Sequence, residues 1–165
     1  MPYPRTIRNF NAFVDGRSYA GLCTQATLPE IALNTEDFRG GGMDMPIPID
    51  MGMAAMTAEL QFKEWSSDLM TRVGGNTRLV LRAGEMGQDD FEASALVFTI
   101  GGRVIATPMG DLGTGQDALL TLRWGVDYFR VARDGDVLVE IDAENAVRII
   151  DGVDQLAGMR RAMGI

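Results

Sequence analysis

The clearest pattern in the chain is the strict alternation of apolar and polar side chains in residues 56–62. Apolar residues stand at every second position there, namely Met56, Ala58, Leu60 and Phe62. Because successive side chains of a strand point to opposite faces, this period of two predicts a half-buried strand. Further strands are predicted at residues 77–82, 91–100, 103–107 and 146–150.

The dipeptide Asp134-Gly135 gives the strongest hairpin signal in the chain. Asp-Gly supplies the positive φ angles that a type I′ turn requires, and here it joins residues 128–133 to residues 136–141. The expected register places Arg133 opposite Asp136, so that opposite charges face each other across the turn.

A second hairpin and a β-bulge follow from the same kind of pattern. Asp15-Gly16 separates residues 9–14 from residues 18–23 and predicts the hairpin. Farther along, apolar residues hold the even positions from 118 to 126 and lose that parity from Phe129. A bulge near Gly125 explains the change, because a bulge inserts one extra residue into a strand.

Two short helices complete the predicted elements. The first begins after Ser66, carries Asp68 in its first turn and ends at Gly74-Gly75. The second spans residues 153–163, and Arg160 near its end suits the helix dipole. Its apolar side carries Leu156, Met159 and Met163.

These elements amount to six to nine strands against two short helices. With 165 residues and 46% apolar composition, the chain is long enough for one domain with one core, residues 1–165. A doubly wound α/β fold would need more helical crossovers. The pattern favours a mainly β fold, an antiparallel β-sandwich or barrel with one or two short peripheral helices.

An alternating segment at about residues 39–55 stands apart from this pattern. It reads RGGGMDMPIPIDMGM over residues 39–53, and every odd position from 43 to 53 is Met or Ile. The period of two predicts an extended arm. We take it as the candidate site, formed by Arg39, Gly40, Gly41, Gly42, Met43, Met45, Ile47, Ile49, Met51 and Met53.

Two prolines restrict how this arm can pair. Pro46 and Pro48 have the same parity, so both missing N–H donors fall on one edge of the strand. The odd residues can still pair on the other edge. The segment is therefore expected to be an edge strand or a projecting arm rather than a central strand.

The apolar face of the arm needs a covering surface. Burial of a Met or Ile side chain is worth about 1.5–3 kcal/mol, so six of them in water would be costly. Either the arm folds back on its own core, or a neighbouring subunit covers it, and flexible Met side chains suit such a contact. In the second case Gly40–Gly42 would form the hinge.

The residue inventory leaves little room for catalysis or metal binding. The chain has no histidine and a single cysteine, Cys23, which excludes histidine-dependent triads and cysteine-based metal clusters. The lone Lys63 does not follow a glycine-rich loop, so no Walker A site exists. The carboxylate pair Asp89-Asp90 is expected in a solvated loop. We expect no enzyme activity, no cofactor and no metal.

Charge and hydropathy restrict the partners. The net charge of −8 makes the chain a poor DNA-sequestering protein, because phosphate binding rests on clustered cations. Such acidity does suit a surface past which nucleic acid moves without sticking. No apolar run approaches the ~18 residues of a membrane span, so we expect no stable membrane association.

Three segments in the right order resemble the major tail tube protein of contractile-tailed phages. They are the N-terminal NFNAFVDGRSYAG, the RGGGM loop at residues 39–43 and the C-terminal VLVEIDAENAVRIIDGVDQLAGMRRAMGI. The resemblance covers most of the chain and is weakest across residues 84–115. The Met-Pro-Ile-Pro-Ile run is not part of it.

This resemblance implies a structural subunit of the virion tail, made in the host bacterial cytoplasm. It implies homo-hexameric rings in which sheets of neighbouring subunits join into a shared inner barrel. The rings stack into a tube that contacts sheath, tape-measure and baseplate proteins and carries DNA only as non-specific cargo in its lumen. The arm would contact the same or the next ring, and we favour the next.

Three alternatives stay open on the sequence. The first is the tube of a DNA-free contractile device, of the bacteriocin or secretion type. The second is a monomeric β-barrel that binds a small ligand in a closed apolar cavity, with the Met-rich arm as a lid. The third is a carboxylate-based hydrolase, which requires two acidic side chains to converge in a cleft.

Overall fold

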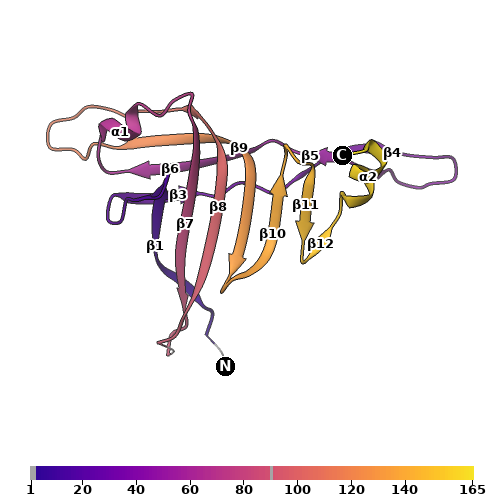
Figure 1. Ribbon diagram of the computed structural model, residues 1–165, viewed down its shortest axis with the longest axis horizontal. Helices are drawn as coiled ribbons and strands as arrows, with labels where there is room; N and C mark the ends of the chain where they lie inside the picture. Colours follow the sequence, from indigo (N-terminus) through magenta and orange to yellow (C-terminus); the bar gives the residue numbers. More distant parts are fainter. Residues whose placement is uncertain (1–2, 90) are drawn as a thin grey trace.

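One antiparallel sheet of ten strands forms most of the molecule (Figure 1). The computed structural model describes residues 3–89 and 91–165. Within them the strand order is β2-β1-β7-β8-β9-β10-β11-β12, with β6 on β9 and β3 on β6. The strands of this sheet are β1 (Thr6–Val14), β2 (Arg17–Ser18), β3 (Cys23–Thr27), β6 (Met56–Phe62), β7 (Asn76–Met86), β8 (Ala93–Ala106), β9 (Leu120–Arg133), β10 (Asp136–Asp142), β11 (Val147–Ile150) and β12 (Val153–Asp154).

The long strand β9 gives the sheet its bend. Its first half pairs with β6 and its second half with β10, while β8 runs along its other edge. Gly101 pairs with Tyr128 and Gly102 with Val126, so Asp127 is the extra residue of a bulge. The bulge that the sequence predicts near Gly125 is confirmed. It lets β6 and the first half of β9 cross above β1, β7 and β8 (Figure 1).

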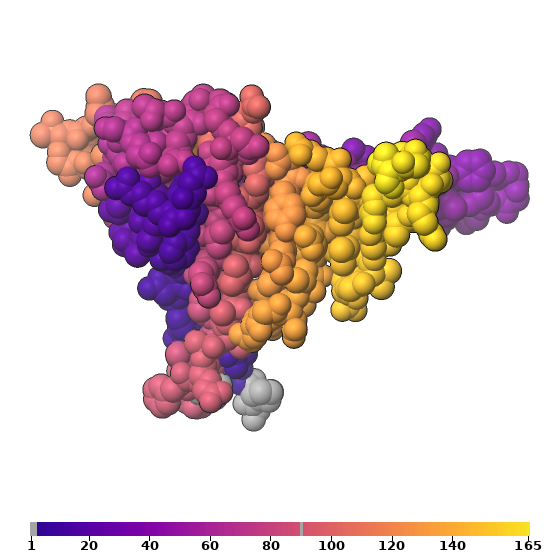
Figure 2. Space-filling view, in the orientation of Figure 1, coloured from indigo at the N-terminus to yellow at the C-terminus, as the bar shows by residue number. Residues whose placement is uncertain are grey.

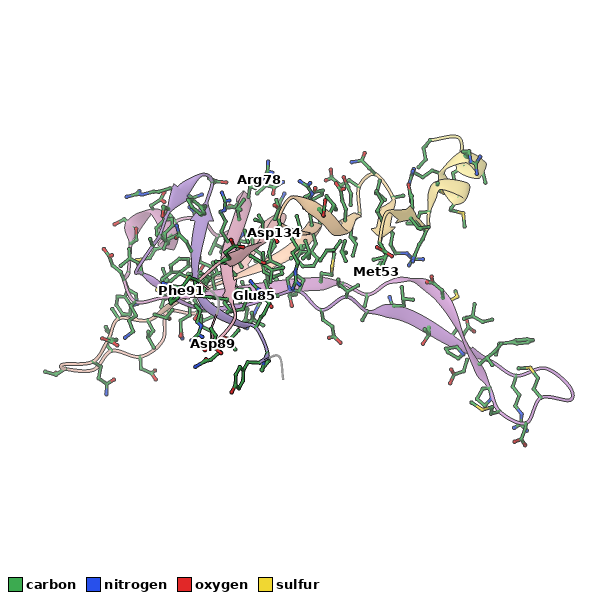
Figure 3. All side chains as sticks on the ribbon, turned by 90° about the horizontal axis from the view of Figure 1, so that it is seen from below. Met53, Arg78, Glu85, Asp89, Phe91 and Asp134 are labelled. Carbon is green, nitrogen blue, oxygen red and sulfur yellow. The ribbon has the colours of Figure 1, made fainter. Side chains whose placement is uncertain are left out.

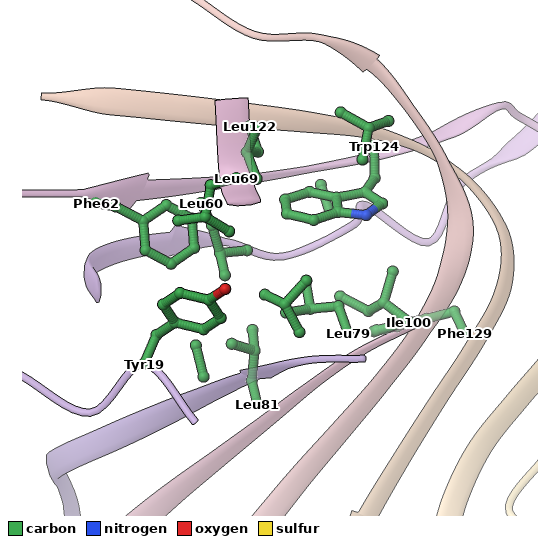
Figure 4. Close-up of a cluster of buried hydrophobic side chains, with 14 of the residues drawn as sticks. Tyr19, Leu60, Phe62, Leu69, Leu79, Leu81, Ile100, Leu122, Trp124 and Phe129 are labelled. Atoms are coloured by element: carbon green, nitrogen blue, oxygen red, sulfur yellow. The ribbon is translucent and has the colours of Figure 1, made fainter. Parts of the chain in front are cut away.

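The hydrophobic core fills the space under this bend (Figure 4). Alternation places Leu60 and Phe62 of β6 on the inner face, as predicted, where they are fully buried. Tyr19 contacts Phe62 edge to face, with ring centroids 5.5 Å apart. Further buried side chains come from five other elements: Val14, Leu69, Leu79, Leu81, Ile100, Leu122 and Trp124. The mainly β, antiparallel fold expected from the sequence is confirmed.

The two strands predicted at residues 91–100 and 103–107 form a single strand, β8. The prediction was wrong because Gly101-Gly102 does not end the strand but faces the bulge of β9. A Cβ atom added at Gly102 would lie 2.1 Å from the carbonyl oxygen of Gly125. The glycine therefore permits a close approach of two backbones.

Replacement of Gly102 by alanine will destabilise the subunit. The added Cβ forces a backbone shift at the bulge, and overpacking of this kind costs roughly 1–3 kcal/mol. Urea unfolding followed by circular dichroism measures the loss. Gly135→Ala is not a suitable control because Gly135 has a positive φ, whereas Gly41→Ala is, since no atom lies within 4 Å of the added Cβ. An unchanged unfolding midpoint for Gly102→Ala would contradict the packing argument.

The two hairpins differ in how well the sequence predicted them. The β9–β10 hairpin is confirmed, with Arg133 opposite Asp136 and positive φ at both Asp134 and Gly135. The first hairpin turns at Asp15-Gly16 as predicted, but its second strand ends at Ser18 rather than at residue 23. The chain turns after Tyr19, whose carbonyl accepts hydrogen bonds from the Leu22 and Cys23 N–H groups.

Both helices are shorter than predicted. Helix α1 spans Ser67–Met70, and its N-cap residue Ser66 makes no side-chain hydrogen bond to the helix. Helix α2 spans Ala157–Met163, because Val153 and Asp154 pair with β11 as strand β12 instead. The side chain of Arg160 forms an ion pair with Asp154 at 2.5 Å, which ties α2 to this strand.

A hydrogen-bonded network holds α1 against the first hairpin. The Tyr19 hydroxyl donates to Asp68 at 2.6 Å, and Arg72 donates to the same carboxylate at 3.0 Å and to Asp15. The bond from Tyr19, followed by that from Arg72, lowers the pKa of Asp68 below its ordinary value. The network therefore depends on an ionised carboxylate.

Acid will weaken this network, and Asp68→Asn will reduce the pH dependence. A carboxyl whose pKa is lower in the folded state stabilises fully above its unfolded pKa, about 4, and loses this contribution as pH falls through the folded pKa. The difference in unfolding free energy between wild type and Asp68→Asn should thus be largest near neutrality and shrink in acid. Urea titrations over that range test this. Asp37→Asn, at an exposed carboxylate, is the control, and a constant difference would contradict the assignment.

Candidate functional site

The predicted arm forms the tip and the second strand of a two-stranded hairpin that projects from the body. Strand β4 (Leu33–Phe38) pairs with β5 (Ile47–Met53), and this small sheet shares no ladder with the ten-stranded sheet. From Met53 the hairpin runs outward (Figure 3). In the space-filling view its end protrudes beyond the C-terminal part of the chain, at the right (Figure 2). The segment Met43–Pro46, predicted to be extended, belongs to the loop at its tip.

The pairing of β5 follows the proline argument. Pro48 lies opposite Asp37, while its neighbours Ile47 and Ile49 lie opposite Phe38 and Glu36. Because proline has no N–H, the ladder hydrogen bonds fall to the two isoleucine pairs. Among the described residues no strand pairs with the other edge of β5. The prediction of a strand that pairs on one edge only is confirmed.

The arm carries a bare apolar surface. Residues directly opposite in a sheet share a face, so Phe38, Ile47 and Ile49 lie on the same side of the hairpin. Between 44% and 68% of each large apolar side chain is exposed, for Phe38, Met45, Ile47, Ile49 and Met51. The arm therefore does not fold back on its own core. Only Met53, at its base, packs there.

The three glycines lie at the tip of the hairpin and not at its base. The prediction that Gly40–Gly42 form a hinge between arm and body was therefore wrong. Gly42 has a φ of +84°, which helps to close the tip. Arg39 donates from Nε to the Met43 carbonyl at 3.1 Å, and the Gly40 N–H lies 3.1 Å from the Met43 sulfur. These contacts order the tip as a compact turn.

At the base, one carboxylate links the arm to the body. Asp50 Oδ2 accepts a hydrogen bond from Arg148 of β11 at 2.7 Å, and Asp50 Oδ1 accepts from the Gly52 N–H at 2.8 Å. These bonds, that from Arg148 first, lower the pKa of Asp50. The sequence did not indicate this pair, because the two residues are 98 positions apart.

The strand opposite β5 was also missed. Strand β4 reads LNTEDF, and every one of its residues is exposed. Its sequence shows no alternation of apolar and polar positions, so the pattern that predicted β5 is lacking here. Phe38 at its end was missed with it.

The lid alternative does not fit this geometry. Beyond Met53 the arm runs away from the body, and its large apolar side chains are exposed rather than packed over a cavity (Figure 3). Met53 at the base of the arm helps to line a hollow of about 320 Å³, together with Val126 and Ile141, but the projecting part of the arm does not line it. Another hollow, of about 670 Å³, is lined by polar residues that include Asp15, Arg78 and Tyr128. A closed apolar cavity under a Met-rich lid is therefore the wrong description.

Three acidic side chains, Asp15, Asp127 and Glu144, line the hollow of about 670 Å³. In residues 3–89 and 91–165, no group of three or more acidic or cysteine side chains is placed to hold a metal ion. Asp89 is exposed, and its neighbour Asp90 lies outside the described residues. In the same part of the chain no helix is long and apolar enough to span a membrane.

Comparison with known proteins agrees with the resemblance seen in the sequence. The family described as phage tail tube protein FII matches residues 4–164. The tail tube protein of Escherichia phage P2 is 31% identical over 175 aligned positions that cover all of both chains. The major tail tube protein of Serratia phage KSP20 is 29% identical and aligns with 92% of this chain and 91% of its own length.

A solved structure shows the same fold. It is a chain of the sheath–tube complex of an extracellular contractile injection system, PVC, in its extended state. The two chains superpose with a TM-score of 0.58 at 12% identity, over 81% of this chain and 93% of the other. The phage relatives are tail tube proteins rather than enzymes. On the family match and the full-length relative, this chain belongs to the phage tail tube protein FII family.

Proposed function

We propose that the chain forms homo-hexameric rings that stack into the inner tube of a contractile phage tail, and that the arm joins each ring to the next. The observation that carries the proposal is the bare apolar face of the arm, with Phe38, Ile47 and Ile49 about half exposed. Each such side chain contributes about 1.5–3 kcal/mol when buried, so contact with another subunit is strongly favoured.

The open sheet supports ring formation. Within the described residues the ten-stranded sheet is not closed, since β12 and β2 end the strand order. Unpaired edges invite pairing with another chain, and closure into a shared barrel removes them. We propose that sheets of neighbouring subunits join around the lumen in this way.

The proposed partners follow from this tube. Sheath protein surrounds the tube, tape-measure protein fills it during assembly, and baseplate proteins contact it. The solved relative comes from a sheath–tube complex, which supports the sheath contact. DNA passes through as non-specific cargo, and the net charge of −8 favours its release, because acidic surfaces repel phosphate. The subunit is made in the host bacterial cytoplasm and ends in the virion tail.

A DNA-free contractile device is the second candidate. The structural relative belongs to an extracellular contractile injection system, which is the observation that favours it. The subunit would form the same tube in either case. Micrographs of intact particles separate the two, because only a phage carries a DNA-filled head.

Electron microscopy of the concentrated purified protein tests the proposal. Rings with sixfold symmetry or hollow stacked tubes are the expected result, and sedimentation should show their growth with protein concentration. A protein that stays monomeric at every concentration, alone and with sheath protein, would overturn it.

A further inference from the structure

We propose that the ion pair between Arg148 and Asp50 fixes the direction in which the arm leaves the body. Arg148 lies in β11 and pairs with Ile141 of β10, so its backbone is held within the ten-stranded sheet. Its side chain is only 9% exposed and reaches Asp50 of β5, which is 41% exposed, at 2.7 Å. The pair thus joins a rigid element to the projecting one.

The arm has few other attachments that could set its direction. In the part of the chain that the structure describes, strands β4 and β5 share no backbone ladder with the main sheet. Among the described residues, Asp50–Arg148 is the sole ion pair between the hairpin and the body. Apart from the two connecting chain segments, the packing of Met53 on the core is the main remaining contact. Because a Met side chain is flexible and adapts its contacts, its packing alone sets the direction of the arm only weakly.

The same carboxylate also holds the point where the arm bends. Its second oxygen accepts from the Gly52 N–H at 2.8 Å. Gly52 has a φ of +102°, and the register of the hairpin shifts here, between Leu33 and Thr35. Because bulges bend strands, a link from this bulge to β11 controls the bend.

Loss of the pair has two separable consequences. Without Asp50, the buried guanidinium of Arg148 has no carboxylate partner, and its Nε already has none among the described residues. An unpaired buried charge destabilises the fold. If Arg148 is replaced as well, this cost disappears, but the link to the arm is still absent. A double variant therefore separates direction from stability.

The test measures the direction of the arm by spin-label distances. Labels at Asp37→Cys on the arm and Asp136→Cys on the body, in a Cys23→Ser background, are diluted with excess unlabelled protein. The intact pair should give one narrow distance peak. Both the single variant Asp50→Asn and the double variant Asp50→Asn with Arg148→Met should lose this narrow peak. The double variant should nevertheless regain the melting temperature that the single variant loses.

Asp117→Asn is the control, because it breaks the ion pair with Lys63 at 2.9 Å, which involves neither the hairpin nor β11. It should keep the narrow peak. A narrow wild-type peak in the double variant would overturn the inference. The role of the pair in assembly rests on the proposed function, but this distance measurement does not. Broad distances together with normal tubes would support the inference and count against the arm as the contact between rings.

Discussion

Replacement of both Ile47 and Ile49 by aspartate will leave the subunit folded and prevent it from polymerising. Both side chains lie on the exposed face of the arm, outside the core, so their loss removes no packing in the core of the subunit. In an assembled tube, however, two carboxylates would be buried without partners. Burial of each unpaired charge costs several kcal/mol. This cost exceeds the roughly 1.5–3 kcal/mol that burial of one apolar side chain of the arm contributes.

Circular dichroism and sedimentation, measured on the same samples, separate folding from assembly. The matched control is Thr35→Asp with Asp37→Asn, which alters the opposite face of the hairpin at nearly constant charge. This control should assemble more readily than the isoleucine variant. If the isoleucine variant unfolds, the arm belongs to the core of its own subunit. If it forms normal tubes, the arm is not the contact.

Trp124→Ala will remove a large part of the stability of the subunit. Trp124 is fully buried where β9 passes over the core, just before the bulge at Asp127 (Figure 4). Deletion of a buried indole typically costs about 3–5 kcal/mol, out of the roughly 5–15 kcal/mol that stabilises a domain. Urea unfolding monitored by circular dichroism measures the change.

Trp124→Phe is the matched control. The indole Nε1 is buried without a hydrogen-bond partner among the described residues, so the phenyl ring removes an unsatisfied donor while it retains most of the apolar volume. The loss should therefore be much smaller than for alanine. Equal losses for both variants would mean that the indole nitrogen, not ring volume, holds the site.

Elements with one buried face could be predicted from the sequence. Strand β6 alternates because the core takes every second side chain, and its bounds were predicted to the residue. The turn at Asp134-Gly135 was predictable because its backbone needs positive φ. In both cases the deciding physics is local, within a few residues of the chain.

Features that depend on distant partners could not be predicted. Gly101-Gly102 resembled the end of a strand because the close approach of Gly125 is visible only in the fold. Strand β4 is exposed throughout and has no pattern of its own. The arm itself was predicted from its alternating Met and Ile residues, and its one-sided pairing from Pro46 and Pro48. Its attachment through Arg148 was not predicted, since ion pairs leave no periodic signal in a sequence.

A cryo-electron microscopy reconstruction of assembled tubes measures most directly whether a second subunit covers the arm. We predict stacked sixfold rings in which Phe38, Ile47 and Ile49 are buried against a subunit of the next ring. Tubes in which these side chains remain exposed to solvent, or pack against their own subunit, would contradict it.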